Sequence, residues 1–142
     1  MAVSVPTVTN GGSALSLMVT PDLLEQARTG KVSDTDFVSC IAASLPYAWS
    51  MVSNLAGELH GGEANSAINR EVPQTAEEWG QMFRMMASDS IRAAVERHYG
   101  VRLAFQNCCS VGVFDPDAEE ARIEFTSPEE QVLNQKPELR NC

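Results

Sequence analysis

The central segment of the chain, residues 33–60, reads SDTDFVSCIAASLPYAWSMVSNLAGELH. Its apolar residues recur at steps of three and four, the spacing of one face of an α-helix: Val38, Ile41, Leu45, Ala48, Val52, Leu55 and Leu59. Between Phe37 and Trp49 apolar residues continue nearly all the way round, which indicates a helix surrounded by protein. We therefore expect this segment to be the most buried element, with the rest of the chain packed onto it.

Pro46 interrupts this segment, because its ring clashes with the carbonyl group four residues earlier and it has no N–H to donate. Two structures fit the sequence: one helix with a kink, or two helices broken at Pro46, with Ser44 helping to cap the second. The continuous apolar face favours the kink. Ser33 is a typical N-cap and Gly61 a typical stop, so we predict a kinked helix over about 34–60.

A second long helix is predicted over about 76–99, antiparallel to the first. Thr75 and Glu78 have the spacing of a capping box, and Gly100 ends the pattern. Its apolar face contains Trp79, Met82, Phe83, Met86, Ala87 and Ala94. Met85 falls on the polar face, so we expect it to mark a contact with a partner chain. The segment between the two long helices, residues 61–74, has no periodic pattern and is predicted to be a loop.

After Gly100 the hydrophobic period changes from 3.6 to 2, which predicts a small three-stranded antiparallel meander over about 101–126. Its strands centre on Leu103, on 110–114 and on Ile123. Thr20 and Ser127 each precede a proline and an acidic residue, which predicts short N- and C-terminal helices. The fold class is therefore α+β, with residues 1–19 as a flexible N-terminal tail, 20–137 as a single domain and 138–142 as a loose C-terminus.

The charge balance limits the classes of partner. The 142 residues include 19 acidic and 10 basic side chains, a formal net charge of −9, with no run of Lys or Arg. Nucleic acid and anionic membranes are therefore unfavourable partners. No apolar run reaches the roughly 20 residues of a membrane span, and the N-terminus does not resemble a secretory signal. We expect a soluble, cytoplasmic protein with reduced cysteines.

A ligand pocket near the Pro46 kink is one interpretation of the aromatic and polar residues. Tyr47, Trp49, His60 and Arg97 would line it and the 61–74 loop would close it, around a small apolar or anionic molecule. Arg97 falls on the apolar face of its helix, where its charge needs a carboxylate or an anionic ligand.

The adjacent Cys108 and Cys109 lie in a predicted turn, where they are candidates for a reactive thiol or a soft-metal ligand pair. Zinc sites normally space their cysteines two to four residues apart, so a structural role is favoured. Cys40 belongs to the predicted core. The sequence predicts neither a cofactor nor a metal centre.

Two functions fit these observations. The first is a small acidic binding protein that acts as an accessory, adaptor or regulatory subunit and self-associates through its helices, for example as a homodimer. The alternative is a small-molecule-binding protein or small enzyme that uses the pocket near Pro46. No nucleophile elbow or phosphate-binding glycine loop is present, which makes the enzyme the less favoured of the two.

Overall fold

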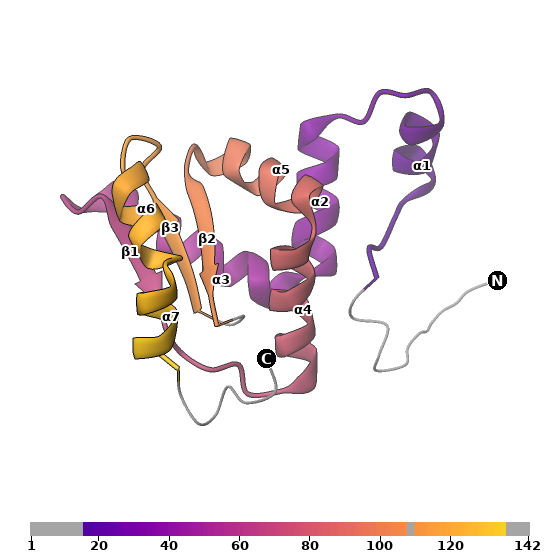
Figure 1. Ribbon diagram of the computed structural model, residues 1–142. Coiled ribbons are helices and arrows are strands. Elements are labelled where there is room, and N and C mark those ends of the chain that lie inside the picture. The colour runs from indigo at the N-terminus through magenta and orange to yellow at the C-terminus, as the bar shows by residue number, and fades with distance from the viewer. Residues whose placement is uncertain (1–15, 108–109, 136–142) are drawn as a thin grey trace.

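A computed structural model (Figure 1) describes residues 16–107 and 110–135. The described residues form an α+β fold of seven helices and one three-stranded antiparallel sheet, which confirms the predicted class. The elements are α1 Pro21–Arg28, α2 Asp34–Ser44, α3 Pro46–Gly61, β1 Ser66–Asn69, α4 Ala76–Ala87, α5 Asp89–Tyr99, β2 Arg102–Gln106, β3 Ser110–Phe114, α6 Glu119–Phe125 and α7 Pro128–Leu133.

The chain bends at Pro46, and the bend divides the central segment into α2 and α3. Leu45, between them, leaves the helical conformation with φ −126° and ψ 62°. In Figure 1 the two helices run in clearly different directions. The apolar face nevertheless continues through the bend, because Leu45 and Ala48 are fully buried.

The start of α3 is capped from another helix. Pro46 opens α3, and no side chain of Leu45 is available to accept from the free amides of the first turn. The buried Gln81 of α4 supplies the acceptor: its Oε1 lies 2.7 Å from the amide nitrogen of Tyr47 and 3.2 Å from that of Ala48. Gln81 thus accepts hydrogen bonds from two amides of the first turn of α3, where a helix has no carbonyl groups of its own to offer.

The predicted helix over 76–99 is divided at Ser88 into α4 and α5. Ser88 has an extended backbone, and its Oγ accepts a hydrogen bond from the amide of Ile91 at 3.3 Å. A serine followed by Asp89 is itself a helix-start signal, so the break has a local cause. Helix α5 packs on α2 and α4 packs on α3, which is the antiparallel arrangement expected of the two long segments.

The sheet has the strand order β1-β3-β2, with both pairs antiparallel. The β2–β3 hairpin was predicted, whereas the third strand was assigned to the wrong segment. It is β1, within the predicted 61–74 loop, and residues 119–125 form helix α6. The buried or half-buried Ala118, Ala121 and Phe125 are three and four residues apart, and Ile123 is exposed. The helical period therefore prevails over the alternation that suggested a strand.

The central strand β3 is buried on both faces. Val111 and Val113 join the main core with α2–α5, while Phe114 packs with Phe125 of α6 in a second, smaller core. Gly112 gives the Phe114 ring its space, because an added Cβ would lie 2.6 Å from that ring. Two covered faces explain why the strand shows no clean alternation of polar and apolar residues.

The predicted exposure of Met85 is wrong. Met85 is fully buried in the main core, whereas Phe83, predicted on the buried face, is 58% exposed. The buried face of α4 instead carries Gln81, Met82 and Met85. Because α4 ends at Ala87, it is free to rotate about its axis independently of α5. It can therefore bury a face that includes Met85, which a continuous helix over 76–99 would expose.

Candidate binding groove

An apolar groove of about 500 Å³ opens between α1, α2 and α5. Val32 and Leu24 on its wall are 44% and 43% exposed. We call this site the α1 groove. Its lining residues are Leu17, Val19, Leu23, Leu24, Ala27, Val32, Asp34, Phe37, Ser90, Ala93 and Arg97.

Helix α1 is held in place by the side chain of Gln26. Its Nε2 donates to the carboxylates of Asp22, at 3.0 Å, and Asp36, at 2.7 Å. Its Oε1 accepts from the amide of Ser33 at 2.9 Å. One residue therefore joins α1 to the connection that follows it and to the first turn of α2. In Figure 1 this helix lies at the end of the molecule away from the sheet.

The chain before α1 runs along α2 and forms part of the groove wall. The amide of Met18 donates to Ser44 Oγ at 2.8 Å, and its carbonyl oxygen accepts from Cys40 Sγ at 3.6 Å. Leu17 packs against the main core. These contacts give the described part of the predicted tail, residues 16–19, a defined position beside α2.

Arg97 has a carboxylate partner, which is one of the two alternatives that its position suggested. Its Nε and Nη2 donate to Asp34 Oδ2 and Oδ1 at 2.9 and 3.0 Å. The hydrogen bond from Arg97 and its positive charge hold the pKa of Asp34 below its usual range. The side chains are 56% and 62% exposed, so the pair contributes little to stability and mainly fixes α5 against α2 at the groove rim.

The other predicted pocket residues have different neighbours. Trp49 packs against His98 and Tyr99 of α5, with ring centroids 5.4 Å from each. His60 lies exposed in the last turn of α3, where a cation interacts favourably with the helix dipole. Tyr47, two residues before Trp49, points to another side of α3.

A second cavity lies where the Pro46 pocket was predicted. It is an open cavity of about 490 Å³ beside the start of α3, and Tyr47 is the predicted site residue in its wall. The remaining walls come from the segment after β1 and from α4: Glu71, Val72, Gln74 and Glu78. Two carboxylates give this cavity an acidic lining, in contrast to the apolar lining of the α1 groove.

Cys108 and Cys109 lie outside the described residues. Within the described ranges, no group of three or more His, Cys, Asp and Glu side chains is placed to hold a metal ion. None of the described helices combines the length and the hydrophobicity that crossing a lipid bilayer requires. Sequence reasoning did not identify the α1 groove. The local signal for it in the sequence is the pair of apolar residues Leu24 and Val32, one before and one after the turn at Gly30.

Comparison with known proteins places the chain in one family. No curated protein and no solved structure gives a significant match. A family model described as "NucS shadow ORF" matches residues 15–142, which is nearly the whole chain. The matched range includes every element of the described fold, from α1 to α7. The chain therefore belongs to the NucS shadow ORF family.

Proposed function

We propose that this protein is a cytoplasmic accessory or regulatory subunit whose α1 groove binds a helix of a protein partner. The observation that carries this proposal is the open apolar groove of about 500 Å³, with walls that include the exposed Leu24 and Val32. A large exposed apolar surface typically marks an interaction site. A groove between helices suits an amphipathic helix, which inserts apolar side chains at positions i, i+3, i+4 and i+7.

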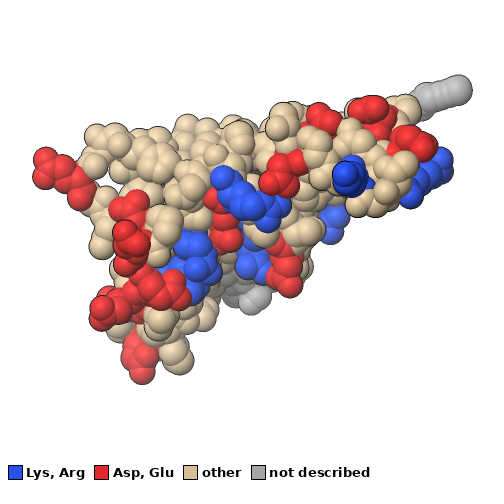
Figure 2. All heavy atoms as spheres, turned by 90° about the horizontal axis from the view of Figure 1, so that it is seen from above, with Lys and Arg blue, Asp and Glu red and all other residues tan. Residues whose placement is uncertain are grey.

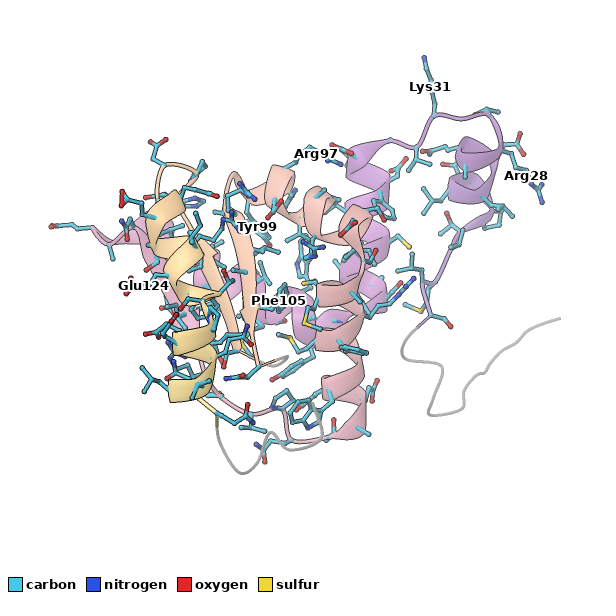
Figure 3. All side chains as sticks on the ribbon, in the orientation of Figure 1. Arg28, Lys31, Arg97, Tyr99, Phe105 and Glu124 are labelled. Carbon is cyan, nitrogen blue, oxygen red and sulfur yellow. The ribbon has the colours of Figure 1, made fainter. Side chains whose placement is uncertain are left out.

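Charges of both signs lie at the α1 end of the molecule, as Figure 2 shows. Figure 3 shows Arg28, Lys31 and Arg97 near this end of the molecule, with Lys31 extending away from the body. Arg97 is paired with Asp34, whereas Arg28 and Lys31 have no ion-pair partner among the described residues. Asp22, Glu25 and Asp36 lie on the same two helices, so charges of both signs surround the groove. The ligand that the groove favours is therefore a helix with an apolar face.

A protein partner is favoured over nucleic acid. The name of the matched family includes the term KH. KH modules in general hold four backbone nucleotides with a Gly-x-x-Gly loop. The present sequence contains no Gly-x-x-Gly, and its net charge is −9. It therefore lacks both the loop and the positive field that nucleic-acid binding uses.

The cavity beside Tyr47 supports a second candidate function, that of a small-molecule-binding protein or small enzyme. Glu71 and Glu78 in its wall favour a cationic ligand over the anionic or apolar molecule expected from the sequence. The α1 groove is favoured as the principal site, because its apolar wall gives a binding energy that an open acidic cavity does not.

Selection of helical peptides from a displayed library tests the proposal. Peptides enriched on the wild-type protein should carry an apolar face, and the Leu24→Asp variant should lose most of their binding. Leu24 is partly exposed, so this substitution should leave the fold intact. Circular dichroism and thermal unfolding check that it does.

The matched control is Phe83→Asp, which places the same charge at an exposed apolar residue outside the groove. This variant should bind the selected peptides as well as the wild type does. Peptides that bind wild type and Leu24→Asp equally would show that the groove is not the binding surface.

A further inference from the structure

Strand β1 forms an open edge of the sheet. In Figure 1 it lies on the side of the sheet away from α4 and α5. The amide of Asp115 donates to the carbonyl oxygen of Asn65 at 3.0 Å, which continues the ladder between β3 and β1 by one pair. Hydrogen-bonded pairs alternate along an antiparallel ladder, so Ala67 bonds to β3, whereas the N–H and C=O groups of Ser66 and Ile68 point away from it.

The other edge of the sheet, at β2, is covered. The carboxylate of Glu96 accepts a hydrogen bond from the amide of Leu103, with Oε2 2.9 Å from the nitrogen, and helices α5 and α6 contact this strand. In the described part of the chain, by contrast, no hydrogen bond reaches the outward groups of Ser66 and Ile68. The Ile68 side chain is 39% exposed. An unpaired edge is a template on which another strand can pair.

A cavity of about 240 Å³ lies along the β1 edge and opens to solvent. Ser66 and Ile68 form one of its walls, and Phe125 of α6 adds apolar surface from the opposite side. Successive side chains of a strand point to opposite faces, so every second side chain of a strand added to β1 would face this cavity. Backbone pairing at the edge would thus be combined with a pocket that distinguishes between side chains.

The surroundings of this cavity are acidic. Glu124 of α6 and Glu130 of α7 line it. Arg70 is the only basic residue in the described lining, and its Nη1 donates to Gln106 Oε1 at 2.6 Å. Residues 110–135 contain seven acidic side chains and one basic side chain, and Figure 2 shows carboxylates gathered at this end of the molecule. A strand with Lys or Arg at the positions that face the cavity is therefore complementary in charge.

We propose that β1 binds an extended, basic segment of a partner protein, which joins the sheet as a fourth strand. The outward N–H and C=O groups of Ser66 and Ile68 pair with its backbone, and its basic side chains meet Glu124 and Glu130. A second copy of this chain fits the edge less well, because it brings the same carboxylates to the contact. A four-residue edge buries a small area, so the complex is weak and sensitive to salt. This site is independent of the α1 groove.

The substitution Ile68→Pro tests the pairing of the edge. Proline has no N–H, and the amide of Ile68 points away from β3, so this change removes an outward donor and leaves the ladder between β1 and β3 in place. The matched control is Ile68→Val, which keeps both the N–H and a β-branched apolar side chain. The double variant Glu124→Gln with Glu130→Gln tests the charge, because glutamine keeps the size and an acceptor oxygen of each side chain.

Selection of linear peptides from a displayed library on the wild-type protein supplies the probes. Peptides that bind the edge should carry Lys or Arg at alternate positions and should bind the Leu24→Asp variant, whose change lies in the α1 groove, as well as the wild type. Ile68→Pro should lower their affinity by about tenfold, and Ile68→Val should leave it unchanged. The double glutamine variant should bind more weakly, with a smaller dependence on salt.

Amide hydrogen exchange of the wild-type protein checks the geometry even if Ile68→Pro fails to fold. A bound peptide should slow exchange of the outward amides of Ser66 and Ile68 by about tenfold when about nine-tenths of the protein is occupied. Exchange at Ala67, which is already bonded to β3, should change little.

Three results would overturn the proposal. The first is that no selected peptide slows exchange at Ser66 and Ile68, or that those peptides bind Ile68→Pro as well as they bind Ile68→Val. The second is equal binding by the wild type and the double glutamine variant, which rejects a basic partner. The third is a wild type that dimerises in sedimentation velocity while Ile68→Pro stays monomeric, which assigns the edge to a second copy.

Discussion

Gln81 provides the strongest test of how the bend at Pro46 is stabilised. This buried side chain of α4 accepts hydrogen bonds from the first two N–H groups of α3, those of Tyr47 and Ala48. The substitution Gln81→Met keeps the length and the flexibility of the side chain and removes the acceptor. It should therefore remove the cap and create little empty space.

The size of the effect follows from the burial of the two amides. Removing the acceptor of a buried hydrogen bond costs about 1–3 kcal/mol. Ala48 is fully buried and should incur the full cost, whereas Tyr47 is half-buried and can recover part of it from water. We expect Gln81→Met to lower the free energy of unfolding by about 2–4 kcal/mol, a large share of the roughly 5–15 kcal/mol typical of a domain.

Urea unfolding followed by tryptophan fluorescence measures this loss, because Trp49 and Trp79 lie on α3 and α4. The matched control is Gln74→Met at an exposed glutamine, which should change the stability by less than about 0.5 kcal/mol. Amide hydrogen exchange at Ala48 should also become faster in Gln81→Met, by more than the loss of global stability alone would cause. A loss under about 1 kcal/mol, with unchanged protection at Ala48, would refute the capping role.

Three other predictions follow from the packing and the charges. Gly112→Ala forces a Cβ against an aromatic ring of β3 and should cost about 1–3 kcal/mol in chemical denaturation. Met85→Asp should prevent stable folding by circular dichroism, whereas Phe83→Asp should unfold at nearly the wild-type temperature. The Asp34–Arg97 pair should stabilise the fold above pH 3.8, the usual pKa of the carboxyl, and this contribution should be lost as the pH falls through the lowered folded-state pKa. The stability difference between wild type and Asp34→Asn should therefore shrink below pH 3.8.

Local signals in the sequence predicted most of the helices. Thr20, Ser33, Thr75 and Ser127 were each identified as an N-cap, and each accepts a hydrogen bond from the amide three residues later. A cap is a contact between near neighbours in the chain, so the sequence pattern contains all the information it needs. The β2–β3 hairpin was predictable for the same reason, because its two strands are neighbours in the chain. The α+β class followed from the change of hydrophobic period after Gly100.

The third strand could not be identified from local pattern. The segment 66–69 is short, and glycine and asparagine residues lie near it in the sequence. It forms strand β1 because it pairs with the edge of β3 that β2 does not occupy. In residues 119–125 the apolar Ile123 and Phe125 alternate with polar residues, as in a strand. The segment nevertheless forms a helix, because one helical face packs against the sheet in the second core. Both errors arise because tertiary packing overrides weak local preference.

The candidate site shows the same division between local and distant contacts. The predicted pocket grouped Tyr47 and Trp49 by their closeness to Pro46, yet residues two apart on a helix point in nearly opposite directions, so one faces a cavity and the other faces α5. The α1 groove, in contrast, exists because the polar side chain of Gln26 fixes α1 to the start of α2. Gln26 and Gln81 act alike, since each uses its amide group to join helices that the backbone alone would leave unconnected. Uncharged glutamines give no distinctive signal in a sequence, and for this reason both the bend and the groove were found only in the structure.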